Sequence, residues 1–132
     1  MTTELVFNQT ESDWKRPESY PDLSDRSIIA VDLETRDPNI KTKGPGWATK
    51  DGEVVGIAVA ADGFKGYFPI AHEAGGNMDK AMTLKWYKKL MENGVDKVCH
   101  NASYDIGWTR SLGIKPTGKI YDTMIAGALI NE

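Results

Sequence analysis

Disulfides, membrane spans and export signals are all missing from this sequence of 132 residues. Its one cysteine, Cys99, cannot form an internal disulfide, and we expect it to be a buried core thiol. No apolar run approaches the ~20 residues that a bilayer-spanning helix needs. The first 24 residues are polar and contain no apolar signal segment. These absences argue against a membrane protein and make a reducing cytoplasm the expected compartment.

A strong excess of positive charge is also missing. Sixteen basic and nineteen acidic side chains leave a net charge of -3. This balance argues against a protein that grips duplex DNA mainly by neutralising phosphates. It does not exclude an enzyme that holds a few nucleotides in a cleft where a metal ion supplies the positive charge. With 40% hydrophobic residues, the chain can form one domain with a real core.

The order of apolar runs and turn residues predicts an α/β domain over residues 27–132, preceded by a polar lead-in over residues 1–26. Trp14, Tyr20 and Leu23 are candidates to fix the lead-in to the domain. We expect strands at 27–33, 54–60, 64–70 and 96–100, a short one within 114–121, and helices at 78–92, 101–112 and 122–131. The first three strands should be antiparallel, and the later ones parallel to the first.

Three details of this pattern predict packing. The first strand is a continuous apolar run, which predicts burial on both of its faces. Residues 35–51 contain helix breakers and are predicted to be a loop. Met82, Trp86, Leu90 and Met91 recur at helical spacing, which predicts the apolar face of a helix.

The first candidate for chemistry is the acid pair Asp32-Leu33-Glu34. Side chains at i and i+2 of an extended chain point to the same side. Two carboxylates at the end of a buried strand repel each other, unless a divalent cation lies between them. The alternative is a pair of solvated acids at the strand end. The same spacing at Asp51 and Glu53 lies in a turn, and we assign it no function.

The second candidate is Asn101-Ala102-Ser103-Tyr104-Asp105, at the start of a predicted helix. Asn101 and Asp105 share a helix face, and the first backbone N–H groups could bind a phosphate. Asn101 could instead be a simple N-cap, and Asp105 an exposed acid. Tyr104 could belong to the core or could stack on a base. His72 is predicted to be a structural or surface residue, while for His100 a place in the cleft remains open.

The two acid motifs, in this order, resemble those of the DEDD family of 3′–5′ exonucleases. Further segments are similar to the proofreading domain of bacterial DNA polymerase I, and the insertion over residues 38–47 looks more like phage-type family A polymerases. Those segments are residues 55–57, 67–72, 97–98, 100–101, 104–105 and 121–124. The likeness extends over roughly residues 27–131.

This resemblance implies an RNase H-like fold, with a mixed sheet of strand order 3-2-1-4-5 flanked by helices. It also implies two-metal hydrolysis of the terminal phosphodiester at the 3′ end of single-stranded DNA, with Mg²⁺ or Mn²⁺. Asp32 would be the shared ligand of both ions. Glu34 would hold one ion and orient the attacking water, and Asp105 would bind the second ion.

The resemblance further implies a nucleic-acid cleft and a larger protein. Asn101 and Tyr104 would line the cleft near the terminal nucleotides, and the chain at Leu33 and Thr35 would also contact them. A polymerase module in the same full-length chain would be the partner. The compartment would be the cytoplasm of a bacterial or phage-infected cell.

The sequence departs from the family pattern in one respect. The family's last motif, a Tyr or His followed closely by an Asp, has no counterpart after Asp122. We therefore expect a C-terminally truncated domain with little activity by itself. The alternative function is a non-catalytic module with a degenerate exonuclease fold that binds single strands or a partner protein. A related nuclease that acts on RNA is a third possibility.

Overall fold

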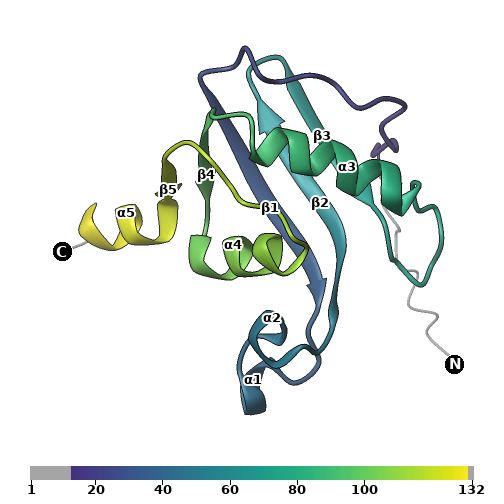
Figure 1. Cartoon of the computed structure of the whole chain (residues 1–132), viewed down its shortest axis with the longest axis vertical. Coiled ribbons are helices and arrows are strands. Elements are labelled where there is room, and N and C mark those ends of the chain that lie inside the picture. Colours follow the sequence, from purple (N-terminus) through teal and green to yellow (C-terminus); the bar gives the residue numbers. More distant parts are fainter. Residues whose placement is uncertain (1–12, 131–132) are drawn as a thin grey trace, which may run out of the picture.

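The computed structural model describes residues 13–130, which form a five-stranded sheet and five helices (Figure 1). The strands are β1 (Ile28–Arg36), β2 (Glu53–Ala61), β3 (Phe64–Pro69), β4 (Asp96–Cys99) and β5 (Ile120–Asp122). The helices are α1 (Ile40–Lys43), α2 (Gly46–Thr49), α3 (Lys80–Met91), α4 (Ala102–Ser111) and α5 (Thr123–Ile130). No helix in the described part of the chain is long and apolar enough to span a bilayer.

The strands follow the order β3-β2-β1-β4-β5. β1 pairs with β2, and β2 with β3, in antiparallel fashion, whereas β4 runs parallel to both β1 and β5. The short turn at Asp62 and Gly63 joins β2 to β3, and each parallel strand is reached through a helix, as such connections require. The order and the directions of the predicted mixed sheet are therefore confirmed.

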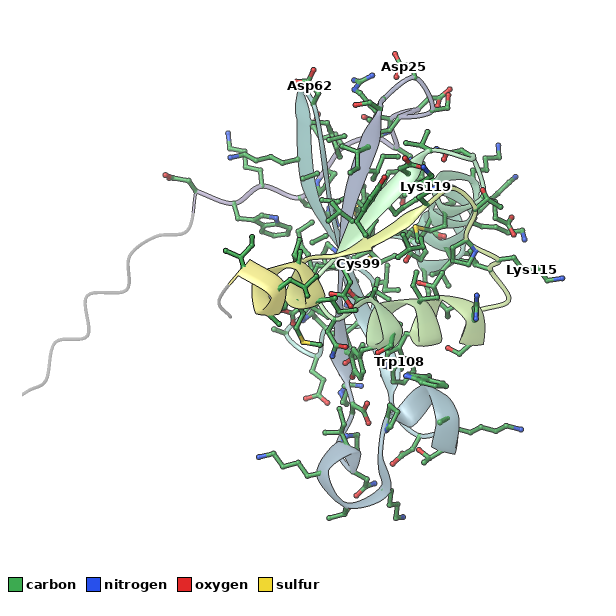
Figure 2. The ribbon with its side chains drawn as sticks, turned by 90° about the vertical axis from the view of Figure 1, so that its left-hand side faces the viewer. Asp25, Asp62, Cys99, Trp108, Lys115 and Lys119 are labelled. Carbon is green, nitrogen blue, oxygen red and sulfur yellow. The ribbon has the colours of Figure 1, made fainter. Side chains whose placement is uncertain are left out.

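The central strand β1 is buried on one face only, so the prediction of burial on both faces is wrong. Ile29, Val31 and Leu33 are buried, while Asp32 and Glu34 are exposed on the other face. Successive side chains of a strand point to opposite faces, and α3 and α4 lie together on one side of the sheet (Figures 1 and 2). The acid pair therefore lies on the open face.

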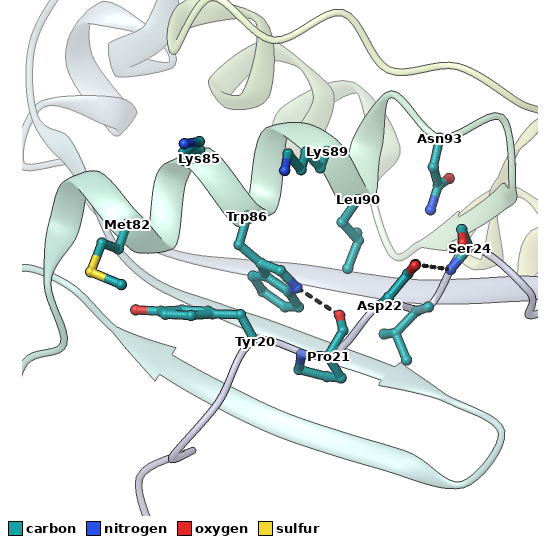
Figure 3. Close-up of a pocket in the computed structure, with 11 residues that line it drawn as sticks. Tyr20, Pro21, Asp22, Ser24, Met82, Lys85, Trp86, Lys89, Leu90 and Asn93 are labelled. Atoms are coloured by element: carbon teal, nitrogen blue, oxygen red, sulfur yellow. Dashed lines mark hydrogen bonds between the residues drawn. The ribbon is translucent and has the colours of Figure 1, made fainter.

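The lead-in contributes to the core through Tyr20 and Leu23. The Tyr20 ring stacks on Phe68 at a centroid distance of 5.9 Å, and Phe68 lies 4.3 Å from Trp86 of α3. The Trp86 indole donates a hydrogen bond of 2.8 Å to the carbonyl of Pro21 (Figure 3). Tyr20 and Leu23 therefore hold the lead-in to the domain, as predicted.

Beside these residues lies a cavity of about 540 Å³ between the lead-in and α3 (Figure 3). Met82 lines this cavity and is 58% exposed. Its predicted place in the apolar face of the helix is therefore wrong, because that side of α3 meets only the thin lead-in. Trp86, Leu90 and Met91 are buried as predicted.

The segment between β1 and β2 contains the one-turn helices α1 and α2, where the sequence predicted only a loop. The carboxylate of Asp37 accepts a hydrogen bond of 3.0 Å from the N–H of Gly46. The Trp47 ring lies so close to Gly107 of α4 that an added Cβ there would come within 2.4 Å of it. These tertiary contacts stabilise helices that are too short to form by themselves.

Candidate metal and nucleic-acid site

Asp32 and Glu34 lie on the part of β1 that extends beyond its neighbour β4. The pairing of β1 with β4 stops at Ala30, and the β1–β2 ladder is irregular between Glu34 and Thr35. The extra residue is Val55 of β2, because Glu34 pairs with Gly56 and Thr35 with Val54, and such bulges are frequent beside active sites. The second half of β1 is therefore open on one edge, at the position where the acids lie.

Asp105 of α4 occupies that open edge. It is only 3% exposed, and its Oδ2 atom has no hydrogen-bond partner within residues 13–130. Burial, together with the nearby charge of Asp32, raises the pKa of Asp105 to about 7, although the N–H of Leu33 opposes this rise. An unpaired buried carboxylate oxygen beside a second carboxylate is costly, and a cation would relieve that cost.

The charges of three acids act on one thiol. Burial above all, and then the charges of Asp105, Asp122 and Asp32 in that order of effect, raise the pKa of Cys99 to about 12. Cys99 ends β4 and is buried, as the sequence predicted. The three carboxylates therefore lie near the Cys99 thiol at the C-terminal end of β4.

The donor atoms in this place suit a hard divalent cation. Asp32, Glu34 and Asp105 offer carboxylate oxygens, which Mg²⁺ and Mn²⁺ prefer. No group of three Asp, Glu, His or Cys side chains closes around a single point within residues 13–130. The acids thus form an open set, in which the unpaired Oδ2 atom of Asp105 is the group that most needs a partner.

The start of α4 does not fit the alternative in which Asn101 is a simple N-cap. This residue has the left-handed backbone angles φ 62° and ψ 63°, and its side chain does not cap the helix. Instead, the carboxylate of Asp122 accepts hydrogen bonds from the N–H groups of Asn101 and Ala102, at 3.0 and 2.9 Å. The expectation that these two N–H groups could bind a phosphate is therefore wrong, because they already have an acceptor.

Asp122 is a residue whose role the sequence did not reveal. Its carboxylate also accepts a hydrogen bond of 3.0 Å from the N–H of Met124, so it caps α5 as well as α4. These hydrogen bonds, that of Ala102 above all, lower the pKa of Asp122. The available signal was an Asp at the first position of a predicted helix, which is typical of an N-cap but says nothing about a second helix.

Thr35 and Tyr104, both predicted to contact nucleic acid, are brought together. The Tyr104 hydroxyl donates to the carboxylate of Asp37 at 2.9 Å and lies 2.7 Å from Oγ1 of Thr35, which donates to it in turn. The Tyr104 ring is half-buried and lies edge-on to the buried Trp108. The side chain of Leu33 belongs to the core, so only its backbone can contact a ligand.

Tyr67 and His72 form a hydrogen-bonded pair that flanks Glu34. The sequence analysis did not predict this pair. Gly56, the partner of Glu34 in the β1–β2 ladder, leaves space for the Tyr67 ring, since an added Cβ would come within 1.8 Å of its hydroxyl. Burial, and to a lesser extent the Glu34 charge, raises the pKa of Tyr67. A glycine inside a strand was the available signal for such a close approach.

Comparison with known proteins adds a family and two phage relatives. A family model described as a 3′–5′ exonuclease matches residues 17–132. A DNA-directed DNA polymerase of Pseudomonas phage M6 is 34% identical over 96% of this chain. The DNA polymerase DpoZ of Vibrio phage phiVC8 is 31% identical over 91% of it. The chain spans only 20% and 17% of the lengths of these two relatives.

Solved structures support the same fold. A structure described as the apo form of a nuclease aligns with a TM-score of 0.53 at 18% identity, over 80% of this chain and 44% of that one. Brucella melitensis NrnC with bound Mg²⁺ aligns with a TM-score of 0.53 at 16% identity, over 83% of this chain and 48% of that one. At these identities the likeness concerns the fold, which is that of RNase H-like nucleases.

Proposed function

This chain belongs to the 3′–5′ exonuclease domain family of family A DNA polymerases, and from that premise we propose that it hydrolyses the terminal phosphodiester at the 3′ end of single-stranded DNA. The reaction depends on two divalent ions, Mg²⁺ or Mn²⁺. The ions supply positive charge to the attacking and leaving oxygens of the phosphodiester. In the full-length protein the domain proofreads for a polymerase module, in a bacterial or phage-infected cytoplasm.

Three acids hold the ions in this proposal. Asp32 would be the ligand shared by both ions, Glu34 would hold one of them and orient the attacking water, and Asp105 would hold the other. Asn101 and Tyr104 line the cleft beside the terminal nucleotides, with the backbone around Leu33 and Thr35. The hydrogen bond that Tyr104 donates to Asp37, and the one that it accepts from Thr35, hold the Tyr104 hydroxyl in position.

The observation that carries the proposal is the state of Asp105. Its carboxylate is buried, one of its oxygens is unpaired, and it faces a second acid at the open edge of β1. A structural acid in such a place would normally be hydrogen-bonded or replaced by a neutral residue. A role as a metal ligand explains both the burial of Asp105 and the lack of a hydrogen-bond partner for its Oδ2 atom.

The chain by itself is expected to turn over slowly, because the fourth acid of the family pattern has no counterpart among these 132 residues. Loss of one ligand of a metal pair weakens metal binding and activity by at least ten- to a hundred-fold. A sensitive assay with Mn²⁺ is therefore needed.

A 5′-labelled single-stranded oligonucleotide, incubated with Mn²⁺, tests the proposal. We expect a ladder of products that shorten from the 3′ end, and no ladder with Asp32→Ala or with EDTA. Asp62→Ala is the matched control, because Asp62 is an exposed acid at the β2–β3 turn (Figure 2). Binding without any cleavage would instead favour the non-catalytic binding module.

A further inference from the structure

The segment between β1 and β2 has a charge unlike that of the rest of the chain. Residues 38–50 contain Lys41, Lys43 and Lys50 and no acidic residue. The remaining residues contain thirteen basic and nineteen acidic side chains. We call residues 38–50 the basic insertion. Such local charge of one sign, on a chain that is acidic elsewhere, indicates a surface for an anionic partner.

The lysines of the basic insertion are free to meet such a partner. All three are exposed, and none forms a salt bridge with another residue in the described range 13–130. Lys41 and Lys43 belong to α1, and Lys50 follows α2. No ion pair within the described residues therefore occupies these lysines, although Asp37 and Asp51 adjoin the basic insertion at its two ends.

The basic insertion is held in place rather than hanging from the sheet. Asp37, directly before it, accepts the N–H of Gly46, and Asn39 donates a hydrogen bond of 2.6 Å to Asp51. Trp47 packs against Gly107 in the middle of α4. Because the backbone of the basic insertion is already ordered, a partner that binds its lysines loses little additional conformational entropy.

The position of the basic insertion links it to the candidate site. Asp37 lies three residues after Glu34 and accepts the hydrogen bond of Tyr104. Figure 1 shows α1 and α2 just beyond the C-terminal end of β1, next to α4. The basic insertion therefore adjoins the end of β1 that follows Glu34.

We propose that the basic insertion binds the phosphates of the substrate strand upstream of its terminal nucleotide. This inference rests on the proposed function, since it assigns the path of the same strand. The basic insertion would thus be a local cationic surface on a chain whose overall net charge is negative. Lys41, Lys43 and Lys50 act in binding and take no part in bond cleavage.

Salt dependence of binding measures these contacts directly. Each phosphate that a lysine neutralises on a single strand contributes about 0.7 to the slope of log K against log salt. Fluorescence anisotropy of a labelled oligothymidylate, in EDTA so that no cleavage occurs, gives that slope. We expect the triple variant Lys41→Gln, Lys43→Gln, Lys50→Gln to lower its magnitude by about 2 and to weaken binding by about ten-fold or more at low salt.

A second triple variant supplies the matched control. Lys85, Lys89 and Lys115 are also exposed and are not in salt bridges within the described residues, but they lie on α3 and in the segment before β5. Their change to Gln removes the same charge and is expected to leave the slope within about 0.5 of the original. Arginine in place of Lys41, Lys43 and Lys50 should preserve it.

The outcomes separate this inference from the proposed function. Equal slopes for the two triple variants, or an unchanged slope for the first, overturn the inference even if Mn²⁺-dependent cleavage persists. A lowered slope in a chain that never cleaves upholds the binding surface and overturns the exonuclease assignment for this chain. No measurable binding of single strands by the unaltered chain overturns both.

Discussion

At the scale of single residues, Asp122 connects three backbone amides at the junction of the sheet with two helices. It accepts from Asn101 and Ala102 at the start of α4 and from Met124 in α5. Asn101 is held with a positive φ, a conformation that Asn tolerates better than most residues. Since Asp105 lies in the first turn of α4, the position of that acid depends on Asp122.

Replacement of this carboxylate should therefore affect both stability and the metal site. We expect Asp122→Ala to lower the melting temperature and to weaken Mn²⁺ binding several-fold, because the first turn of α4 loses its acceptor. Asp79→Ala is the control, since Asp79 caps α3 through the N–H of Met82 at 2.8 Å. It should lower the melting temperature but leave Mn²⁺ affinity unchanged; an equal loss of affinity in both variants would show that Asp122 is merely structural.

The lowered pKa of Asp122 also predicts how stability depends on pH. An acid whose pKa is lower in the folded state than its ordinary value of 3.8 stabilises the fold fully above that value. This contribution declines as the pH falls below 3.8 toward the folded pKa. In urea unfolding, we expect the stability gap between the unaltered chain and Asp122→Asn to shrink from about pH 5 to about pH 2.5. A gap that is constant or grows over this range would contradict the assignment.

At the scale of elements, the basic insertion and α4 form one unit. Trp47 lies over Gly107, the position on α4 where a side chain would collide with the indole ring. The hydroxyl of Tyr104, one turn earlier, donates to Asp37 at the base of the insertion. The helix that carries Asp105 is thus supported from the insertion as well as from Asp122.

A methyl group at Gly107 should separate the two elements. Ala at this position gains helix propensity, yet its Cβ would come within 2.4 Å of the Trp47 ring. We expect Gly107→Ala to lower the free energy of unfolding by about 1–3 kcal/mol, the usual cost of overpacking. Gly127→Ala in α5 meets nothing within 4 Å and should be neutral or stabilising by up to about 1 kcal/mol. Chemical denaturation distinguishes the two, and a stabilising Gly107→Ala would refute the contact.

The elements that were predictable from the sequence are those with a local signal. Strands β1 and β2 contain apolar runs bounded by turn residues, and the acids of β1 were visible as a pair at the end of such a run. The helices α1 and α2 were not predictable, because they depend on Asp37 and Trp47 rather than on local propensity. The burial of Asp105 and the double cap at Asp122 were hidden for the same reason, since both depend on contacts with distant residues.

At the scale of the whole molecule, the two faces of the sheet differ. α3 and α4 cover one face, whereas the other contains an open hollow of about 520 Å³ whose lining includes Asp32, His100 and Thr123. Asp32 and Glu34 are exposed on the open face, whereas Asp105 is buried and belongs to α4 on the covered side. The candidate metal site therefore lies at the edge where the two faces meet, open to a strand that arrives from outside.

The central claim is that these carboxylates bind divalent ions, and calorimetric titration with Mn²⁺ tests it most directly. The account predicts two Mn²⁺ ions per chain, with affinity reduced at least ten-fold in Asp105→Asn and unchanged in Asp62→Asn. The buried Oδ2 atom of Asp105 is then the ligand that the variant replaces. Equal Mn²⁺ binding by the unaltered chain and Asp105→Asn, or no binding by either, would contradict the account.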